Sequence, residues 1–342
     1  MDFGMFTDFH IRPHRSQVEA FDESFNQVEA AEQLGMDAVW LAEHHFSPER
    51  SVLASPLVIA SAIAARTTMI RLGLAVQVLP LTNPLRLAEE AATVDHISKG
   101  RFDFGVGRSG LTRYYQGYNV PYTESRSRFL EALEIITKAW RQESFSHHGE
   151  FFAFHDVTVV PKPYQQPHPP IRVALASADT FALIGRLGHA IFISANTPTL
   201  QMQERLAVYR QARQEAGYTG PADIALRIPA YVAETAERAR SEPEASAMHA
   251  IRYAAEELSA TAASPEIAER LRHTASTPYD DILKQRLLYG TPEAVVDRLQ
   301  EYQDTLGITG VVLEMNYGGR IPYERVINSM RLLTARVLPK FK

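Results

Sequence analysis

The sequence contains no cysteine among its 342 residues. This absence excludes disulfide bonds, thiolate-bound zinc, cysteine-ligated iron–sulfur clusters and a cysteine nucleophile. The sequence also lacks a strong excess of one charge. It has 35 Lys and Arg and 40 Asp and Glu, which gives a formal net charge of −5. A mildly acidic chain of this kind does not attract nucleic acid or an anionic membrane, so neither is expected as a partner.

Long hydrophobic runs are also missing. The most apolar stretch, residues 52–65, contains two serines and a proline and is shorter than the roughly 20 residues that span a bilayer. The first residues show no basic segment followed by an apolar one, as a secretion signal would. We therefore expect a cytoplasmic protein.

Short β-branched and aromatic runs alternate with longer helical patterns. Strands are predicted at residues 2–6, 38–41, 71–76, 102–106, 171–175, 190–193, 224–232 and 310–314. Helices are predicted at 24–34, 84–97, 125–140, 180–187, 200–216, 292–306 and 323–337. The alternation indicates parallel βαβ units, and eight strands at this spacing favour an α/β fold of the (β/α)8 TIM-barrel type, as one domain over 1–342.

Two connections are longer than the barrel needs. The first insertion, 144–170, follows the fourth strand and carries aromatic residues and a proline-rich run. The second, 234–290, follows the seventh strand, is rich in Ala, Glu and Arg, and is expected to be mostly helical. We expect this second insertion to cover the barrel mouth as a lid.

Functional side chains of such a barrel lie at the carboxyl ends of its strands. Glu43, His44 and His45 follow the second strand, where neighbouring side chains point to different sides. One histidine can therefore face the mouth as a general base while the other packs behind it. Two structural histidines remain an alternative. No metal site is expected, because the other candidates, His147 and His148, lie in an insertion without an evident carboxylate partner.

Two further segments suggest a phosphate site. The glycine-rich run 105–110 follows the fourth strand, and its Arg108 could join Arg126 of the next helix on one phosphate. The segment from Ser177 to Thr180 opens a helix, where hydroxyls and free N–H groups bind anions. Surface arginines and an ordinary helix cap are the alternatives at these two places.

Several motifs, in order along nearly the whole chain, resemble one family. The most telling are E-H-H-F at 43–46 and K-G-R-F-D-F-G-V-G-R at 99–108, and others occur at 2–6, 35–42, 72–80, 83–90, 290–293 and 314–339. In these motifs the chain resembles the bacterial luciferase-like, flavin-dependent monooxygenases. The resemblance implies a (β/α)8 barrel that binds FMN at its mouth and oxygenates a small organic substrate through a flavin hydroperoxide.

The resemblance also implies roles for individual residues. His44 matches the catalytic histidine, and Ala75 and Val76 match a non-prolyl cis peptide beside the flavin. The residues implied in binding the flavin phosphate are Arg108, Arg126, Ser177 and Thr180, with Ala176 beside them in the cofactor site. Family members dimerise through the helices expected at 56–66 and 84–97, which implies a homodimer.

The chain departs from the luciferases proper at two positions. Ala176 stands where they have an acidic residue, and Ala195 stands where they have an aromatic one, so light emission and a long-chain aldehyde substrate are not expected. With no dinucleotide-binding domain visible, reduced FMN would come from a separate NAD(P)H-dependent flavin reductase. A hydride-transferring deazaflavin enzyme and a non-catalytic flavin-binding protein remain alternatives. We expect aromatic side chains to line the pocket, drawn from Phe6, Phe9, Phe46, Tyr114, Tyr115 and Tyr118.

Overall fold

The computed structural model describes residues 1–175, 178–260 and 265–342 and shows a closed parallel barrel. Its strands, in order around the barrel, are β1 (Asp2–Thr7), β2 (Ala38–Leu41), β3 (Arg71–Leu74), β5 (Phe102–Gly107), β8 (Ile171–Ala174), β9 (Ala190–Ser194), β10 (Ile224–Val232) and β12 (Gly310–Glu314). Each strand pairs in parallel with the next, and β12 closes the ring by pairing with β1. The predicted TIM barrel is confirmed, and all eight strands lie where they were predicted, within two residues.

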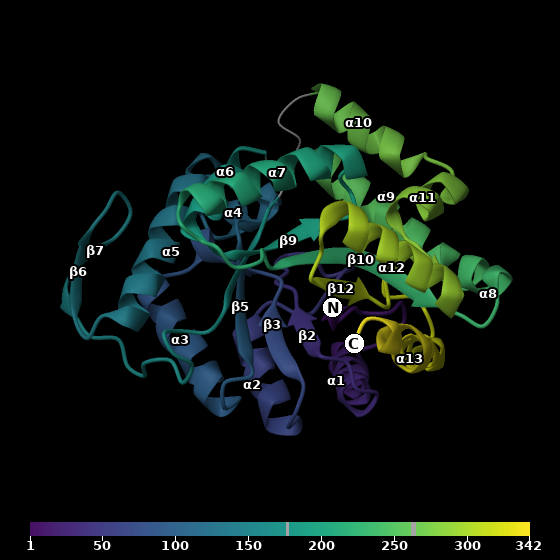
Figure 1. Cartoon of the computed structure of the whole chain (residues 1–342), viewed down its shortest axis with the longest axis horizontal. Helices are drawn as coiled ribbons and strands as arrows, with labels where there is room; N and C mark the ends of the chain where they lie inside the picture. Colours follow the sequence, from purple (N-terminus) through teal and green to yellow (C-terminus); the bar gives the residue numbers. More distant parts are fainter. Residues whose placement is uncertain (176–177, 261–264) are drawn as a thin grey trace.

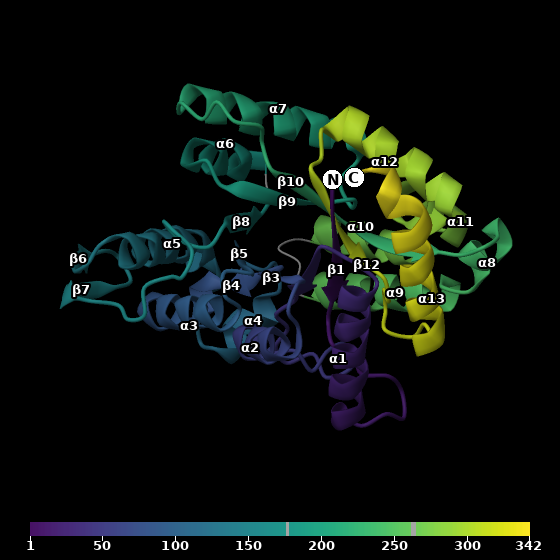
Figure 2. The ribbon, with the colours of Figure 1, turned by 60° about the horizontal axis from the view of Figure 1, so that its bottom comes forward.

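Helices surround the strands on the outside, and the two chain ends lie side by side (Figures 1 and 2). The helices of the barrel are α1 (Gln17–Gln33), α2 (Pro56–Arg66), α3 (Pro84–Ile97), α5 (Ser125–Arg141), α6 (Ala178–Leu187), α7 (Thr199–Glu215), α12 (Pro292–Leu306) and α13 (Tyr323–Leu332). Shorter elements complete this part of the chain: β4 (Gln77–Val78), which pairs with β5, and α4 (Thr112–Gly117). The amino group of Met1 donates to the Phe341 carbonyl at 3.0 Å, which joins the two ends.

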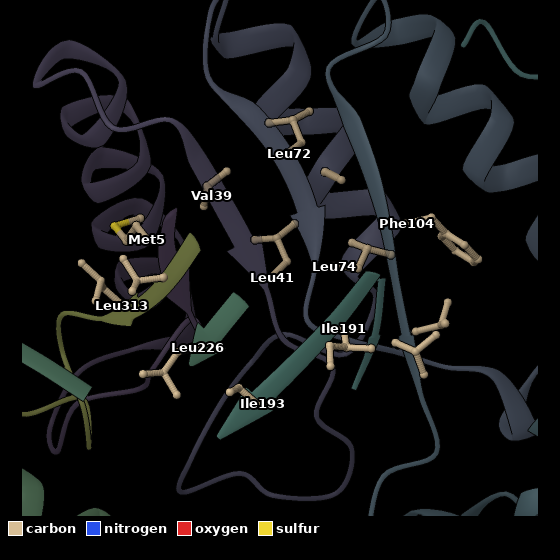
Figure 3. Close-up of a cluster of buried hydrophobic side chains, with 14 of the residues drawn as sticks. Met5, Val39, Leu41, Leu72, Leu74, Phe104, Ile191, Ile193, Leu226 and Leu313 are labelled. Carbon is tan, nitrogen blue, oxygen red and sulfur yellow. The ribbon is translucent and has the colours of Figure 1, made fainter. Parts of the chain in front are cut away.

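Alternation along the strands divides the apolar side chains into two layers. One set points outward and packs against the helices, and Figure 3 shows part of it, including Met5, Leu41 and Leu74. The other set, which includes Phe6, Trp40 and Phe192, forms a separate cluster. Since side chains of successive strand residues point to opposite faces, this second set fills the barrel interior.

The Trp40 side chain leaves room only for glycine at two positions inside the barrel. A Cβ atom on Gly4 of β1 would lie 2.3 Å from the Trp40 indole nitrogen, and one on Gly73 of β3 would lie 2.1 Å from its ring. The indole of β2 therefore occupies the space left by the missing side chains on β1 and β3, the strands on either side of it. It also packs edge-on against Phe192, with 5.0 Å between ring centroids.

The first helix begins earlier than predicted. Ser16 caps α1, with its hydroxyl accepting from the Glu19 backbone N–H while the Glu19 carboxylate accepts from the Ser16 N–H. This reciprocal capping starts the helix at Gln17 rather than at Ser24. At the other end, Gly35 takes a left-handed conformation with φ of 82°, as its position after the helix predicts.

The two insertions build separate features. The first forms an antiparallel hairpin of β6 (Phe145–His148) and β7 (Ala153–Val157). There His147 lies 3.2 Å from the Glu131 carboxylate of α5, so the expectation that it lacks a carboxylate partner was wrong. The second contains α8 (Ala236–Ser241), α9 (Glu244–Ala260), α10 (Pro265–Ala275), α11 (Tyr279–Arg286) and β11 (Leu288–Gly290). Among the described residues no helix has the length and apolarity needed to cross a membrane.

Candidate active site

A cavity of about 350 Å³ opens at the carboxyl ends of the barrel strands. Its walls include Asp8 after β1, His44 and Arg50 after β2, Arg227 of β10, Glu314 of β12 and Glu257 of α9. Helix α9 therefore closes one side of the cavity, where the sequence predicted a cover. The cavity lies where a TIM barrel carries its functional groups.

His44 is held at both ring nitrogens. Its Nε2 lies 2.9 Å from Asp8 Oδ1, and its Nδ1 lies 2.8 Å from the hydroxyl of Tyr114 in α4. The other Asp8 oxygen, Oδ2, accepts from the Arg50 guanidinium at 3.3 Å. Asp8 is fully buried, and the His44 side chain is only 9% exposed. The imidazole is thus fixed by its contacts, with part of the ring facing the cavity.

Burial and charge set the protonation of this group. Burial, together with the positive charge of Arg50, lowers the pKa of His44 to about 4, although Asp8 opposes the shift. Burial alone would raise the pKa of Asp8, but the charge that His44 carries when protonated and the charge of Arg50 lower it well below its usual range. At neutral pH His44 is therefore uncharged and Asp8 is ionised.

The second histidine belongs to a different network. His45 Nε2 lies 2.7 Å from Glu43 Oε1, and the other Glu43 oxygen accepts from the Gln77 amide and the Val78 N–H. His45 is buried and does not line the cavity. Of the two adjacent histidines, one faces the mouth and one packs behind, as strand-end geometry predicts.

Sequence reasoning missed several charged residues of the cavity. Arg227 donates to Glu314 Oε2 at 2.8 Å, and its guanidinium carbon lies 3.9 Å from the centre of the Phe6 ring. Arg227 interrupts an otherwise apolar strand and Glu314 ends another, which is a signal that could have found them. Arg50 and Glu257 carry no such signal, because they lie in a loop and on an ordinary polar helix.

Asp8, His10 and Glu314 bring oxygen and nitrogen atoms within 4.8 Å of one another, a spacing that a metal ion could use. The two carboxylates already pair with Arg50 and Arg227, so their charges are balanced within the chain.

A second cavity, of about 260 Å³, adjoins the first. Ser109 and Gly110 line both. The predicted phosphate-site residues Arg108, Arg126 and Thr180 all line the second cavity. Arg108 donates to Ser125 at 3.3 Å, and Arg126 pairs with Asp179. Ala176 and Ser177, also predicted here, lie outside the described residues.

The peptide bond between Ala75 and Val76 is cis, as the resemblance implied. Val76 lines the second cavity, and both residues pack against the cluster inside the barrel. The bond therefore lies where the barrel interior meets this cavity.

The aromatic lining expected for the main cavity was wrong. Phe9 is fully buried and packs edge-on against Phe21 and Phe25 of α1. Tyr114 is buried behind His44 rather than exposed to the cavity. The aromatic residues at the cavity wall are instead Tyr253 and Tyr317, among many ionisable ones.

Comparison with known proteins identifies the family of the chain. The sequence profile described as luciferase-like monooxygenase matches residues 1–309. The chain belongs to this family. It is 26% identical to the oxygenase component of the flavin-dependent trigonelline monooxygenase of Acinetobacter baylyi, across 100% of this chain and 96% of that protein. It is 37% identical over 183 residues to the uncharacterized protein y4vJ of Sinorhizobium fredii, and this match spans about half of that relative, 52% of its length.

Solved structures agree in fold. The monooxygenase RslO1 from Streptomyces bottropensis superposes with a TM-score of 0.86 at 29% identity, covering 100% of both chains. The oxygenating constituent of 3,6-diketocamphane monooxygenase from Pseudomonas putida, solved with FMN, gives 0.84 at 20% identity over 100% and 99%. An F420-dependent secondary alcohol dehydrogenase gives 0.77 at 18% identity over 100% and 99%. The last two similarities are of fold alone.

Proposed function

We propose that this luciferase-like monooxygenase is the oxygenase component of a two-component system that uses reduced FMN and dioxygen to oxygenate a small organic substrate. The observation that carries the proposal is the adjacency of two cavities. One gathers Arg108, Arg126 and Thr180, and the other is lined by His44. A ligand with a phosphate at one end and a reactive ring at the other suits this arrangement.

The side chains of the second cavity fit a flavin phosphate. Arg126 and Thr180 stand in the first turns of α5 and α6, where helix N-termini favour an anion. The remaining wall is largely apolar and includes Phe129, Leu130 and Val173. Charged donors at one end and apolar walls beside them match the two parts of FMN. When bound there, reduced FMN would supply the activation of dioxygen.

The residues of the main cavity would then perform three tasks. His44 would hold a proton at Nε2, near the place where the flavin ring and the substrate meet. Helix α9, through Glu257 and Tyr253, would keep water from that place. The many ionisable groups on the wall favour a polar substrate over a long-chain aldehyde or a hydrocarbon.

Partner chains follow from the same proposal. The relative from Acinetobacter baylyi is an oxygenase component, which supports a separate NAD(P)H-dependent flavin reductase here. The proposed homodimer would use α2 and α3, where Val58 is 68% exposed and Ile97 is 44% exposed. Apolar side chains exposed on neighbouring helices favour contact with a second copy.

Anaerobic titration tests the cofactor site. Reduced FMN, reduced riboflavin and reduced coenzyme F420 are compared by fluorescence with the wild type, Arg126→Ala and Arg128→Ala. We expect FMN to bind more tightly than riboflavin, and Arg126→Ala to reduce this preference about tenfold, since a charged hydrogen bond contributes about 1.5–3 kcal/mol when buried and less in a half-exposed site. Arg128 lies on the same helix but pairs with Glu124, outside the cavity, so its variant should behave as the wild type.

Product and hydrogen peroxide yields test the reaction. With chemically reduced FMN, dioxygen and a panel of polar substrates, and without any reductase present, we expect an oxygenated product to form and the yield of hydrogen peroxide to fall by the same amount, because reduced FMN gives hydrogen peroxide when no substrate is oxygenated. Tight binding of F420 together with no preference for FMN over riboflavin would instead identify a deazaflavin enzyme. Tight FMN binding with no oxygenated product and an unchanged yield of hydrogen peroxide across the panel would favour a flavin-binding protein.

A further inference from the structure

The contacts of His44 determine which ring nitrogen carries its proton. Asp8 Oδ1, at 2.9 Å from Nε2, belongs to an ionised carboxylate, which can only accept a hydrogen bond. The proton of the neutral ring must therefore lie on Nε2. With that proton placed, Nδ1 has a lone pair and can only accept.

Tyr114 satisfies the other nitrogen. Its hydroxyl lies 2.8 Å from Nδ1, and burial raises its pKa, so the phenol keeps its proton and can donate it. A protonated phenol at this distance can donate to the lone pair of Nδ1. Asp8 therefore selects the arrangement of protons, and Tyr114 can satisfy it as a donor.

Asp8 is itself held in place. Arg50 occupies its Oδ2 at 3.3 Å, and His10 Nε2 lies 3.7 Å from the same oxygen. The Ser51 hydroxyl donates to the Asp8 backbone carbonyl. Because Oδ2 is engaged by a cation, Oδ1 remains for His44, and the carboxylate cannot rotate without losing a buried ion pair.

We propose that Asp8 and Tyr114 are positioning residues that hold neutral His44 as the Nε2–H tautomer, with Nδ1 unprotonated. Neither nitrogen then offers a free lone pair to the cavity. Tyr114 occupies the lone pair of Nδ1, and the proton on Nε2 becomes available to the cavity as its bond to Asp8 opens. The kinetic consequence rests on the proposed function, whereas the tautomer does not.

Nitrogen NMR of histidine-labelled protein tests the tautomer directly, because the shifts of protonated and bare ring nitrogens differ widely. His44 is identified by the signal lost in His44→Gln. At pH 7 we expect a protonated Nε2 and a bare Nδ1. In Asp8→Asn, whose amide can donate or accept, the Nδ1–H tautomer should become detectable. Tyr114→Phe should retain Nε2–H but shift the Nδ1 signal.

A matched control is available in the second histidine network. Tyr118 lies 3.1 Å from His45 Nδ1, so Tyr118→Phe should move the His45 signals and leave those of His44 unchanged. A wild-type His44 that is protonated on Nδ1, or on both nitrogens, would overturn the proposal. Unchanged His44 signals in Asp8→Asn would show that Asp8 does not position the ring. An unshifted Nδ1 signal in Tyr114→Phe would show the same for Tyr114.

Turnover supplies a separate readout. We expect kcat to fall at least tenfold in Asp8→Asn and Tyr114→Phe, while the dissociation constant of reduced FMN stays within twofold of the wild type. Because FMN binding reports folding, a variant that binds FMN normally has not failed to fold. If the NMR result holds but kcat does not change, the tautomer stands and its part in the proposed reaction is wrong.

Discussion

Gly107 offers a quantitative test of how the second cavity is built. A Cβ atom added there would lie 2.6 Å from Val76 Cγ2, but 3.4 Å from Val76 Cβ and 3.6 Å from Ala174 Cβ. Carbon atoms pack at about 3.5–4.0 Å, so only the Val76 methyl group would have to move, by about 1 Å. Overpacking of this kind costs about 1–3 kcal/mol. Replacing glycine returns about 0.4–1 kcal/mol by reducing the freedom of the unfolded chain.

We therefore expect Gly107→Ala to lower the free energy of unfolding by about 1–2 kcal/mol. Gly110→Ala is the matched control in the same glycine-rich segment, because no atom lies within 4 Å of its added Cβ. It should unfold as the wild type or be slightly more stable.

The double variant makes the test specific. Val76→Ala removes the methyl group that clashes and leaves the added Cβ at 3.4 Å from its nearest neighbour. Urea unfolding of the wild type, both single variants and the double variant should give a coupling of about 1–2 kcal/mol in favour of the double variant. Additive effects would show that Val76 does not oppose a side chain at position 107, and would refute this account of the cavity wall.

Two further predictions concern buried polar groups. The Tyr289 hydroxyl is buried and, among the described residues, has no hydrogen-bond partner, so Tyr289→Phe should leave stability unchanged or raise it by about 1 kcal/mol in thermal or urea unfolding, and a loss of more than that would reveal a hidden partner. The pKa of His44 is lowered to about 4 in the folded chain, so between pH 6.5 and pH 4 this residue takes up a proton only when the chain unfolds. Its contribution to the free energy of unfolding is therefore fully present above this range and is lost as the pH falls through it. From pH 7 to pH 5 this residue should account for a loss of about 2 kcal/mol in the free energy of unfolding. In His44→Gln, the free energy of unfolding should depend less on pH by that amount. The contribution of His189, whose pKa burial also lowers to about 4, should remain.

Much of the fold was predictable because the relevant signals are local. The strands at 38–41, 224–232 and 310–314 were predicted to the residue, since apolar β-branched runs bounded by turns leave little choice. The start of α1 was also readable from Ser16 and Glu19, whose spacing forms a capping box, but the apolar pattern alone placed it later.

Residues of the site were predictable only where they belong to sequence motifs. The resemblance brought Val76, Arg108, Arg126 and Thr180 to one cofactor site, and the structure gathers them in one cavity. The ionisable wall of the main cavity was not foreseen. Arg50 and Glu257 are distant in sequence and carry no local pattern, so nothing before folding brings them together.

Local patterns in the chain are enough to establish a parallel barrel with its functional groups at one end, because strand and helix periodicities need no distant contacts. They also place His44 at that end. The protonation of His44 was decided only by the fold, since it depends on Asp8 and Tyr114, which lie 36 and 70 residues away along the chain. Burial and distance change proton affinities, and both quantities exist only once the barrel has closed.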